Sequence, residues 1–344
     1  MIQKPKRHYI SILLRTILLC VLLFLIVRIV NFRDFIDILS NAAPIFVICV
    51  LCACVVDLMA MGAKWTILLR VFGIRVSPLI PILAYFTGRG FSFFVPSTIG
   101  IDSYKTYFMV RHSNGTVVPV ISSILVERFI GMFSSFGMIS LLMPFSIPFI
   151  MSDSPPSLWI AVPFFFFGVC ALLYLLLHLS QYGNIRSDKL PFLPSFVSRK
   201  LAVLLKTLSC VTNAKKSVFL YFFVSIFEKT LYGTAVYFSL RAIGYSFPYL
   251  AIIGVIPILS LLERLPISFS SIGIREGLFV AVFSLHGLSG AESLSVAVII
   301  RCVEVFIVVT SLLLWYASGL NKESREELAT VNEKVTHLYN EEDK

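Results

Sequence analysis

Apolar stretches long enough to cross a bilayer dominate this chain of 344 residues. Hydrophobic residues make up 58% of it and charged residues only 14%, whereas soluble proteins carry about 25% charged residues. The apolar runs are continuous rather than alternating, which argues against a membrane β-barrel. Several approach the roughly 20 residues of a transmembrane helix, so the sequence predicts an all-α polytopic membrane protein with about seven to eight transmembrane helices.

The basic residues orient these predicted helices. Residues 180–216 hold seven lysines and arginines against one acid, Asp188. Positive loops stay in the cytoplasm, so we expect this loop and the N-terminus to be cytoplasmic. We expect one transmembrane domain over residues 1–320 and a polar tail over 321–344. Full spans are predicted over residues 10–30, 44–63, 117–150, 158–179, 217–241, 248–264 and 293–317.

Two segments do not resemble clean spans. Residues 79–116 are interrupted by Pro96 and Gly100, and residues 266–287 by Pro266, Gly273 and Gly277. Irregular backbone is tolerated inside a membrane where it lines a cavity. We therefore predict two broken or re-entrant helices. The sequence leaves open whether both re-enter from the same side or one of them spans fully.

The broken segments belong to a weak internal repeat. Residues 99–133 match residues 272–306 at a constant offset of 173, with six of 35 positions identical. The match aligns Ile-Gly-Ile at 99–101 with Ile-Gly-Ile at 272–274, and Arg128 with Arg301. We extend it to repeat-related segments 79–150 and 248–317. Related halves of this kind typically enclose a polar site near the middle of the membrane.

Charged residues inside the apolar segments are the candidates for that site. A lone charge in mid-bilayer costs at least ~2.5–3.5 kcal/mol, so these side chains should face a partner or water rather than lipid. The first reading is a set of salt bridges that locks helices together, and the second is a hydrated cavity for a charged lipid headgroup. The candidates for the cavity are Arg128, Arg301, Arg275, Glu127, Glu276 and Glu304, with Asp57, Glu228 and Lys229 as secondary candidates and Asp102 beside the first turn.

One charged pair receives a different prediction. Glu263 and Arg264 end an apolar run. Long charged side chains at such places can extend to the membrane surface, so this pair is the weakest candidate for the cavity.

Several function classes are excluded by missing motifs. The chain contains no Gly-x-x-x-x-Gly-Lys-[Ser/Thr] phosphate loop, no His-Glu-x-x-His zinc motif and no Gly-x-Ser-x-Gly nucleophile motif. Cys49 and Cys52 have CxxC spacing but sit in an apolar helix, where cysteines act as small hydrophobes. The net charge of +10 comes from local clusters rather than a basic stripe. We expect no enzyme activity, no cofactor, no metal and no nucleic-acid partner.

The candidate motifs resemble one family. Ser270–Leu278, Ser-Ser-Ile-Gly-Ile-Arg-Glu-Gly-Leu, is similar to the Gly-Leu-Gly-Val-Arg-Glu-Gly signature of the flippase-like membrane domain of lysylphosphatidylglycerol synthases. Val126–Phe129 resembles that family's Glu-Arg helix, and Phe94-Val95-Pro96 with Gly100 and Asp102 resembles its first proline–glycine–acid motif. The chain departs from the pattern at Ser97-Thr98-Ile99, where a glycine-richer run is usual. The resemblance implies a multi-span membrane domain linked to moving modified or glycosylated lipids between leaflets.

Three hypotheses for function follow. The leading one is translocation of a phospholipid, an aminoacylated lipid or a glycosylated lipid across the bacterial cytoplasmic membrane. Full synthases carry a soluble aminoacyl-transfer domain after the membrane part, and this chain ends 27 residues after its last predicted span, so we do not expect synthase activity. The alternative is a non-catalytic membrane partner of a separate lipid-modifying transferase, which would dock on loop 180–216. The third is a structural protein whose charges only hold helices together.

Overall fold

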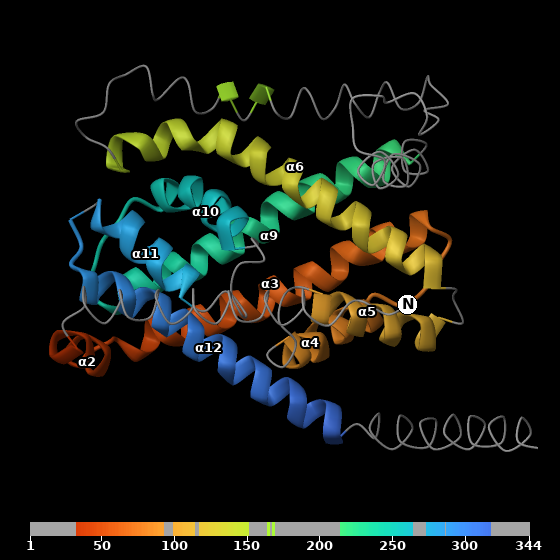
Figure 1. The fold of residues 1–344 in the computed structure, drawn as a ribbon, viewed down its shortest axis with the longest axis horizontal. Helices are drawn as coiled ribbons and strands as arrows, with labels where there is room; N and C mark the ends of the chain where they lie inside the picture. Colours follow the sequence, from red (N-terminus) through yellow and green to blue (C-terminus); the bar gives the residue numbers. More distant parts are fainter. Residues whose placement is uncertain are drawn as a thin grey trace, which may run out of the picture.

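The described part of the chain is helical and contains no strand, as a computed structural model shows (Figure 1). This part comprises residues 32–92, 99–113, 117–150, 164–165, 167–168, 214–263, 273–285 and 287–317. The predicted all-α class is confirmed. The helices are α2 (Phe32–Ser40), α3 (Pro44–Val71), α4 (Leu79–Ser92), α5 (Ile99–Ser113), α6 (Val117–Ile150), α9 (Lys215–Ala242), α10 (Tyr249–Glu263), α11 (Ile274–Ser284) and α12 (Gly290–Ala317).

Three of the described helices are long and apolar enough to cross a membrane: Pro44–Val71, Val117–Leu142 and Gly290–Leu313. The prediction of a helix over 117–150 matches α6. α3 continues past the predicted end at residue 63, so Lys64 lies inside the helix. The spans predicted at 10–30 and 158–179, nearly all of loop 180–216, Pro96, Pro266 and the tail 321–344 lie outside the described residues.

Helices α3 and α9 form an antiparallel pair at the centre of the fold (Figure 1). The N–H of Ala43, just before α3, donates to the carbonyl of Ala242 at the end of α9, at 2.8 Å. The rings of Phe46 and Phe238 stack nearby, with centroids 6.3 Å apart. The start of α3 therefore meets the end of α9, and the two helices run in opposite directions.

The repeat extends well beyond the 35 residues visible in the sequence. Gly73 follows the end of α3 and has φ 83°, and Gly244 follows the end of α9 and has φ 84°. The two glycines are 171 residues apart. Each glycine adopts a left-handed conformation that terminates the helix and that glycine adopts more readily than other residues. The next residue in each half, Ile74 or Tyr245, donates a backbone hydrogen bond of 2.9 Å to the carbonyl five residues earlier.

Glycine contacts repeat at the same offset. Gly62 of α3 lies against the backbone of Ile82 in α4, and Gly233 of α9 lies against Ile253 in α10. Both glycines let a long helix approach the following short helix closely. Since α3 and α9 run in opposite directions, the two repeats are inverted relative to each other.

The two short-helix pairs, α4–α5 and α10–α11, lie at opposite ends of the molecule (Figure 1). The ends of α3 and α5 and the start of α6 share one hydrophobic cluster, which includes Leu69, Met109 and Val120. The ends of α9 and α11 and the start of α12 share another, with Leu240 and Phe283. Each short-helix pair thus begins and ends at its own end of the molecule. Whether these two pairs re-enter the membrane or span it stays a prediction.

The last long helix of each half packs against the first short helix of the other half. α6 of the first half packs on α10, where Ser146 Oγ donates to the carbonyl of Ala251 at 2.8 Å. α12 of the second half packs on α4, where Leu312 contacts Gly90. A space between the halves is therefore bounded by both repeats.

Candidate functional site

A cavity of about 280 Å³ lies between the two halves. Residues from α3, α4, α5, α6, α9, α10, α11 and α12 line it, so every described helix except α2 contributes. Its charged lining consists of six acids and six bases, which gives it no net formal charge. They are Asp57, Asp102, Glu127, Glu228, Glu263 and Glu304, and Lys64, Arg89, Lys105, Arg128, Lys229 and Arg275.

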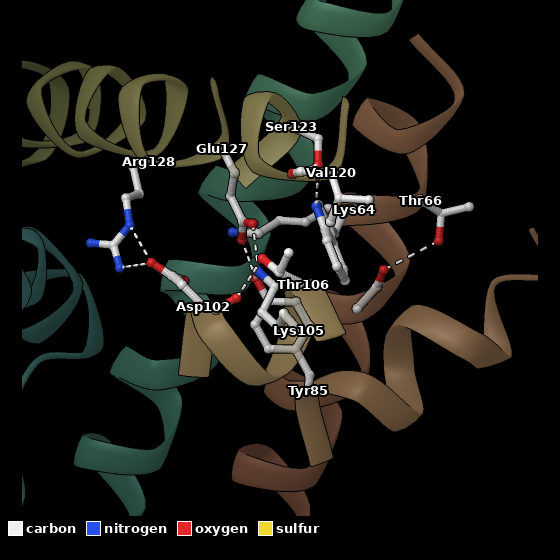
Figure 2. Close-up of polar contacts among 12 residues, drawn as sticks. Lys64, Thr66, Tyr85, Asp102, Lys105, Thr106, Val120, Ser123, Glu127 and Arg128 are labelled. Atoms are coloured by element: carbon white, nitrogen blue, oxygen red, sulfur yellow. Dashed lines mark hydrogen bonds and ion pairs between the residues drawn. The ribbon is translucent and has the colours of Figure 1, made fainter. Parts of the chain in front are cut away.

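A buried lysine dominates the wall formed by the first half (Figure 2). Lys105 of α5 is 2% exposed, and its ammonium group donates to Glu127 at 2.7 Å and to the Tyr85 hydroxyl at 2.6 Å. The same group lies 4.2 Å from the ring centre of Trp65 and 4.0 Å from that of Tyr85. Tyr85 also donates a hydrogen bond to Glu127. Carboxylate, hydroxyl and two aromatic faces together compensate this cation for its loss of water.

Arg128 is more accessible than its neighbours. It follows Glu127 on α6 and extends in another direction to Asp102 in the first turn of α5 (Figure 2). Its Nε donates to Asp102 Oδ2 at 2.9 Å, and its Nη2 donates to the same oxygen. The side chain of Arg128 is 42% exposed and that of Asp102 is 27% exposed. Arg128 is more exposed than its neighbours Glu127 and Lys105 in the charged lining.

The wall formed by the second half is a denser network. Arg275 of α11 donates to Glu304 of α12 at 2.6 Å and to Glu263 of α10 at 3.1 Å. The Arg275 side chain is only 9% exposed. Glu263 also accepts a hydrogen bond from the Tyr232 hydroxyl at 3.2 Å. Glu263, the weakest candidate from the sequence, thus has partners on two other helices, and Arg264 lies outside the described residues.

Arg301 and Glu276 form an ion pair of 2.9 Å just behind this wall, outside the cavity lining. Glu276 also accepts the N–H of Gly273 at 2.7 Å, and this bond fixes the start of α11. The pair resembles that of Arg128 with Asp102: Arg301 is the repeat equivalent of Arg128, and Glu276 lies one position after the equivalent of Asp102. In each half, an acid in the first turn of the short helix bonds an arginine on the long helix.

The centre of the cavity lies where α3 and α9 cross. Lys64 of α3 bonds Glu228 of α9 at 3.0 Å, and Lys229 lies 3.9 Å from the same carboxylate. The side chains of all three are at most 6% exposed. Asp57 lies 171 residues before Glu228 and is its repeat equivalent. It lines the same cavity and is 6% exposed.

Most of the residues predicted from the sequence lie together in this cavity. Arg301 and Glu276 adjoin it. Gly100 lies in the first turn of α5, Gly273 immediately before α11 and Gly277 within α11, and none of the three lines the cavity. The predicted residues in the lining are Arg128, Arg275, Glu127, Glu304, Asp102, Asp57, Glu228 and Lys229.

Sequence reasoning did not select Lys64, Arg89, Lys105, Tyr85 or Glu263. The two lysines were assigned to positions outside clean spans, and Tyr85 carries no charge to mark it. The one available signal was the spacing of Lys105 after Asp102, which puts both on one face of a helix. The remaining residues are recognised only once helices distant in sequence are placed side by side.

A comparison with protein families decides what kind of domain contains this cavity. The model of the lysylphosphatidylglycerol synthase TM region matches residues 12–311. The chain belongs to this family. None of the curated proteins matches it. The family assignment makes it a membrane domain related to lipid modification, and it covers both inverted repeats and all of the charged cavity lining.

Proposed function

We propose that the protein moves a lipid between the leaflets of a membrane and holds its polar headgroup in the central cavity. One observation carries the proposal: twelve charged side chains from both inverted halves line a single cavity in a chain that is otherwise strongly apolar. Salt bridges that only joined helices would need no such space among them. Inverted halves around a central polar site are the arrangement that alternating-access transporters use.

The cavity is suited to a headgroup and not to a whole lipid. Its volume of about 280 Å³ is at the lower end of small-molecule sites, which start near ~300 Å³. The acyl chains would remain in the apolar surroundings. A lipid phosphate would compete with Asp102 for Arg128, because an arginine fork binds phosphate and carboxylate alike. The amine of an aminoacylated headgroup would find carboxylates in the same lining, and a glycosylated headgroup would find hydrogen-bonding partners of both kinds.

The arrangement of the short-helix pairs favours a lipid path that opens alternately to the two faces of the membrane. We propose that α4–α5 and α10–α11 are re-entrant, that they enter from opposite faces of the membrane and that they meet at the cavity. In this scheme the membrane is the bacterial cytoplasmic membrane, and the N-terminus and loop 180–216 are cytoplasmic. The expectation that the protein catalyses no covalent reaction belongs to the same proposal.

Reconstitution tests the proposal. Purified protein in liposomes is given fluorescent phosphatidylglycerol, phosphatidylethanolamine and an aminoacylated lipid, and an impermeant quencher reports the lipid that reaches the outer leaflet. We expect Arg128→Gln to slow translocation at least roughly tenfold, since a charged hydrogen bond contributes ~1.5–3 kcal/mol. Arg70→Gln, at an exposed position near the end of α3, is the matched control. Equal rates for wild type and Arg128→Gln reject the site, and no translocation of any of these lipids by wild type rejects the function.

The transferase-partner hypothesis stays a prediction. Nearly all of loop 180–216 lies outside the described residues, and no observation on the described helices favours it. The purely structural hypothesis is tested in the same experiment. If Arg128→Gln folds normally and still loses translocation, helix locking does not account for Arg128.

A further inference from the structure

Asp57 differs from every other carboxylate that lines the cavity. Its side chain is 94% buried, because only 6% of its surface is exposed. Its Oδ1 atom has no hydrogen-bond partner among the described residues. It lies on α3 within the cavity lining, where α3 crosses α9. A buried carboxyl oxygen without a partner is costly, so it requires an explanation.

The cations around Asp57 are bonded to other acids. Lys64 on its own helix and Lys229 on α9 lie 3.0 Å and 3.9 Å from Glu228. Arg89 on α4 lies 3.8 Å from Glu304 on α12. Glu228, Arg89, Lys64 and Lys229 are the charged groups that act on Asp57 from its own helix and from the helices around it. Within the described part of the chain, Asp57 itself forms no ion pair.

The inverted repeat makes this difference informative. Asp57 and Glu228 occupy equivalent places on the two crossing helices, and both carry a carboxyl group. Glu228 is neutralised by lysine, and Asp57 has no bonded cation. An ionised carboxylate in such a place is far more costly than a neutral one. A proton on Asp57 removes this charge without any movement of a side chain.

Protonation also changes the charge of the cavity. The six acids and six bases of the lining cancel when all are ionised. With one proton on Asp57, the lining carries one net positive charge. A headgroup with one net negative charge then restores neutrality, so the proton and the anionic headgroup favour each other's binding.

We propose that Asp57 is a proton-binding site, and that it couples lipid movement to a proton gradient by carrying one proton together with each anionic headgroup. The proton comes from water on one side, forms an O–H bond on the Asp57 carboxyl group and returns to water on the other side. No other bond is made or broken. The coupling rests on the proposed function, whereas the proton site itself stands on Asp57 alone.

The proton site is tested without any lipid movement. Infrared spectra of the purified protein in nanodiscs, from acidic to alkaline buffer, report the carbonyl stretch of protonated carboxyl groups. We expect a titrating band in wild type and in Asp34→Asn, which alters an exposed carboxyl group of α2. The band should be lost in Asp57→Asn and kept, at a shifted position, in Asp57→Glu. Identical spectra of wild type and Asp57→Asn overturn the site.

The coupling is tested in proteoliposomes with fluorescent phosphatidylglycerol and an imposed pH gradient. One proton per lipid allows a leaflet ratio of up to roughly tenfold per pH unit, because one unit corresponds to about 1.4 kcal/mol. We expect wild type and Asp57→Glu to accumulate the lipid towards the alkaline side, and Asp57→Asn to lose this accumulation. Wild-type movement that ignores the gradient overturns the coupling and leaves the proposed function intact. If wild type moves no lipid at all, the proposed function and the coupling both fail, and the spectra still decide the proton site.

Discussion

The two halves share a backbone design but use their arginines differently. Arg128 in the first half is 42% exposed and bonds one carboxylate, Asp102. Its repeat equivalent Arg301 is 16% exposed and lies within ion-pair distance of both Glu276 and Glu304. The second half is held by a continuous ion-pair network, whereas the arginine of the first half is accessible to solvent. Equivalent positions in a repeat therefore need not have equivalent roles.

The largest expected loss of stability comes from breaking the ion-pair network of the second half. Glu304→Gln removes a carboxylate within ion-pair distance of Arg89, Arg275 and Arg301, which leaves the buried network with an excess positive charge. We expect a loss of ~3–5 kcal/mol in the free energy of unfolding, the usual cost of breaking a buried ion pair. Denaturant titration in mixed micelles measures this. Glu292→Gln, at the exposed first turn of the same helix, should cost less than about 1 kcal/mol; equal losses would contradict the contrast.

A smaller effect is expected from the first half. Lys105→Met keeps much of the volume between Trp65 and Tyr85 but removes the cation bonded to Glu127. The Tyr85 hydroxyl still donates to that carboxylate, so we expect a loss of about 2–3 kcal/mol. Adding Glu127→Gln should restore at least half of it, because the unneutralised buried carboxylate is then gone. The same unfolding titration on both variants checks this, and a double variant less stable than Lys105→Met would contradict it.

The smallest effects compare the two glycine contacts. A methyl group at Gly62 would lie 2.4 Å from Cα of Ile82, where the backbone cannot yield. At Gly233 the nearest atom is Cγ1 of Ile253, at 3.2 Å, and a side chain can shift. We expect Gly62→Ala to cost ~1–3 kcal/mol and Gly233→Ala less than ~1 kcal/mol. Thermal unfolding measures both, and the opposite order would show that the first half is the more adaptable one.

The sequence was sufficient for the all-α class and for much of the charged cavity lining. Apolar length alone predicted α6 from its first residue to its last. The cost of isolated charge in a membrane identified eight residues that line the cavity. Both arguments depend on local properties of the chain, which is why they succeed without knowledge of the tertiary contacts.

What the sequence could not supply was the pairing of distant residues. Lys64 and Glu228 are 164 positions apart, and nothing near either residue indicates the other. Glu263 was the weakest candidate because it ends an apolar run, and its partner Arg275 lies on another helix. Most of the repeat was hidden as well, because it shows in turn geometry and isolated glycines such as Gly73 and Gly244 rather than in a continuous run of matching side chains.

The long separation of Lys64 and Glu228 has a consequence for biogenesis. A ribosome releases α3 well before it has made α9, so the lysine enters the membrane ahead of its carboxylate. Until α9 arrives, that ammonium group must remain beside water or the insertion machinery. The polar core is therefore completed late in synthesis, and a chain truncated before α9 should be retained and degraded rather than integrated.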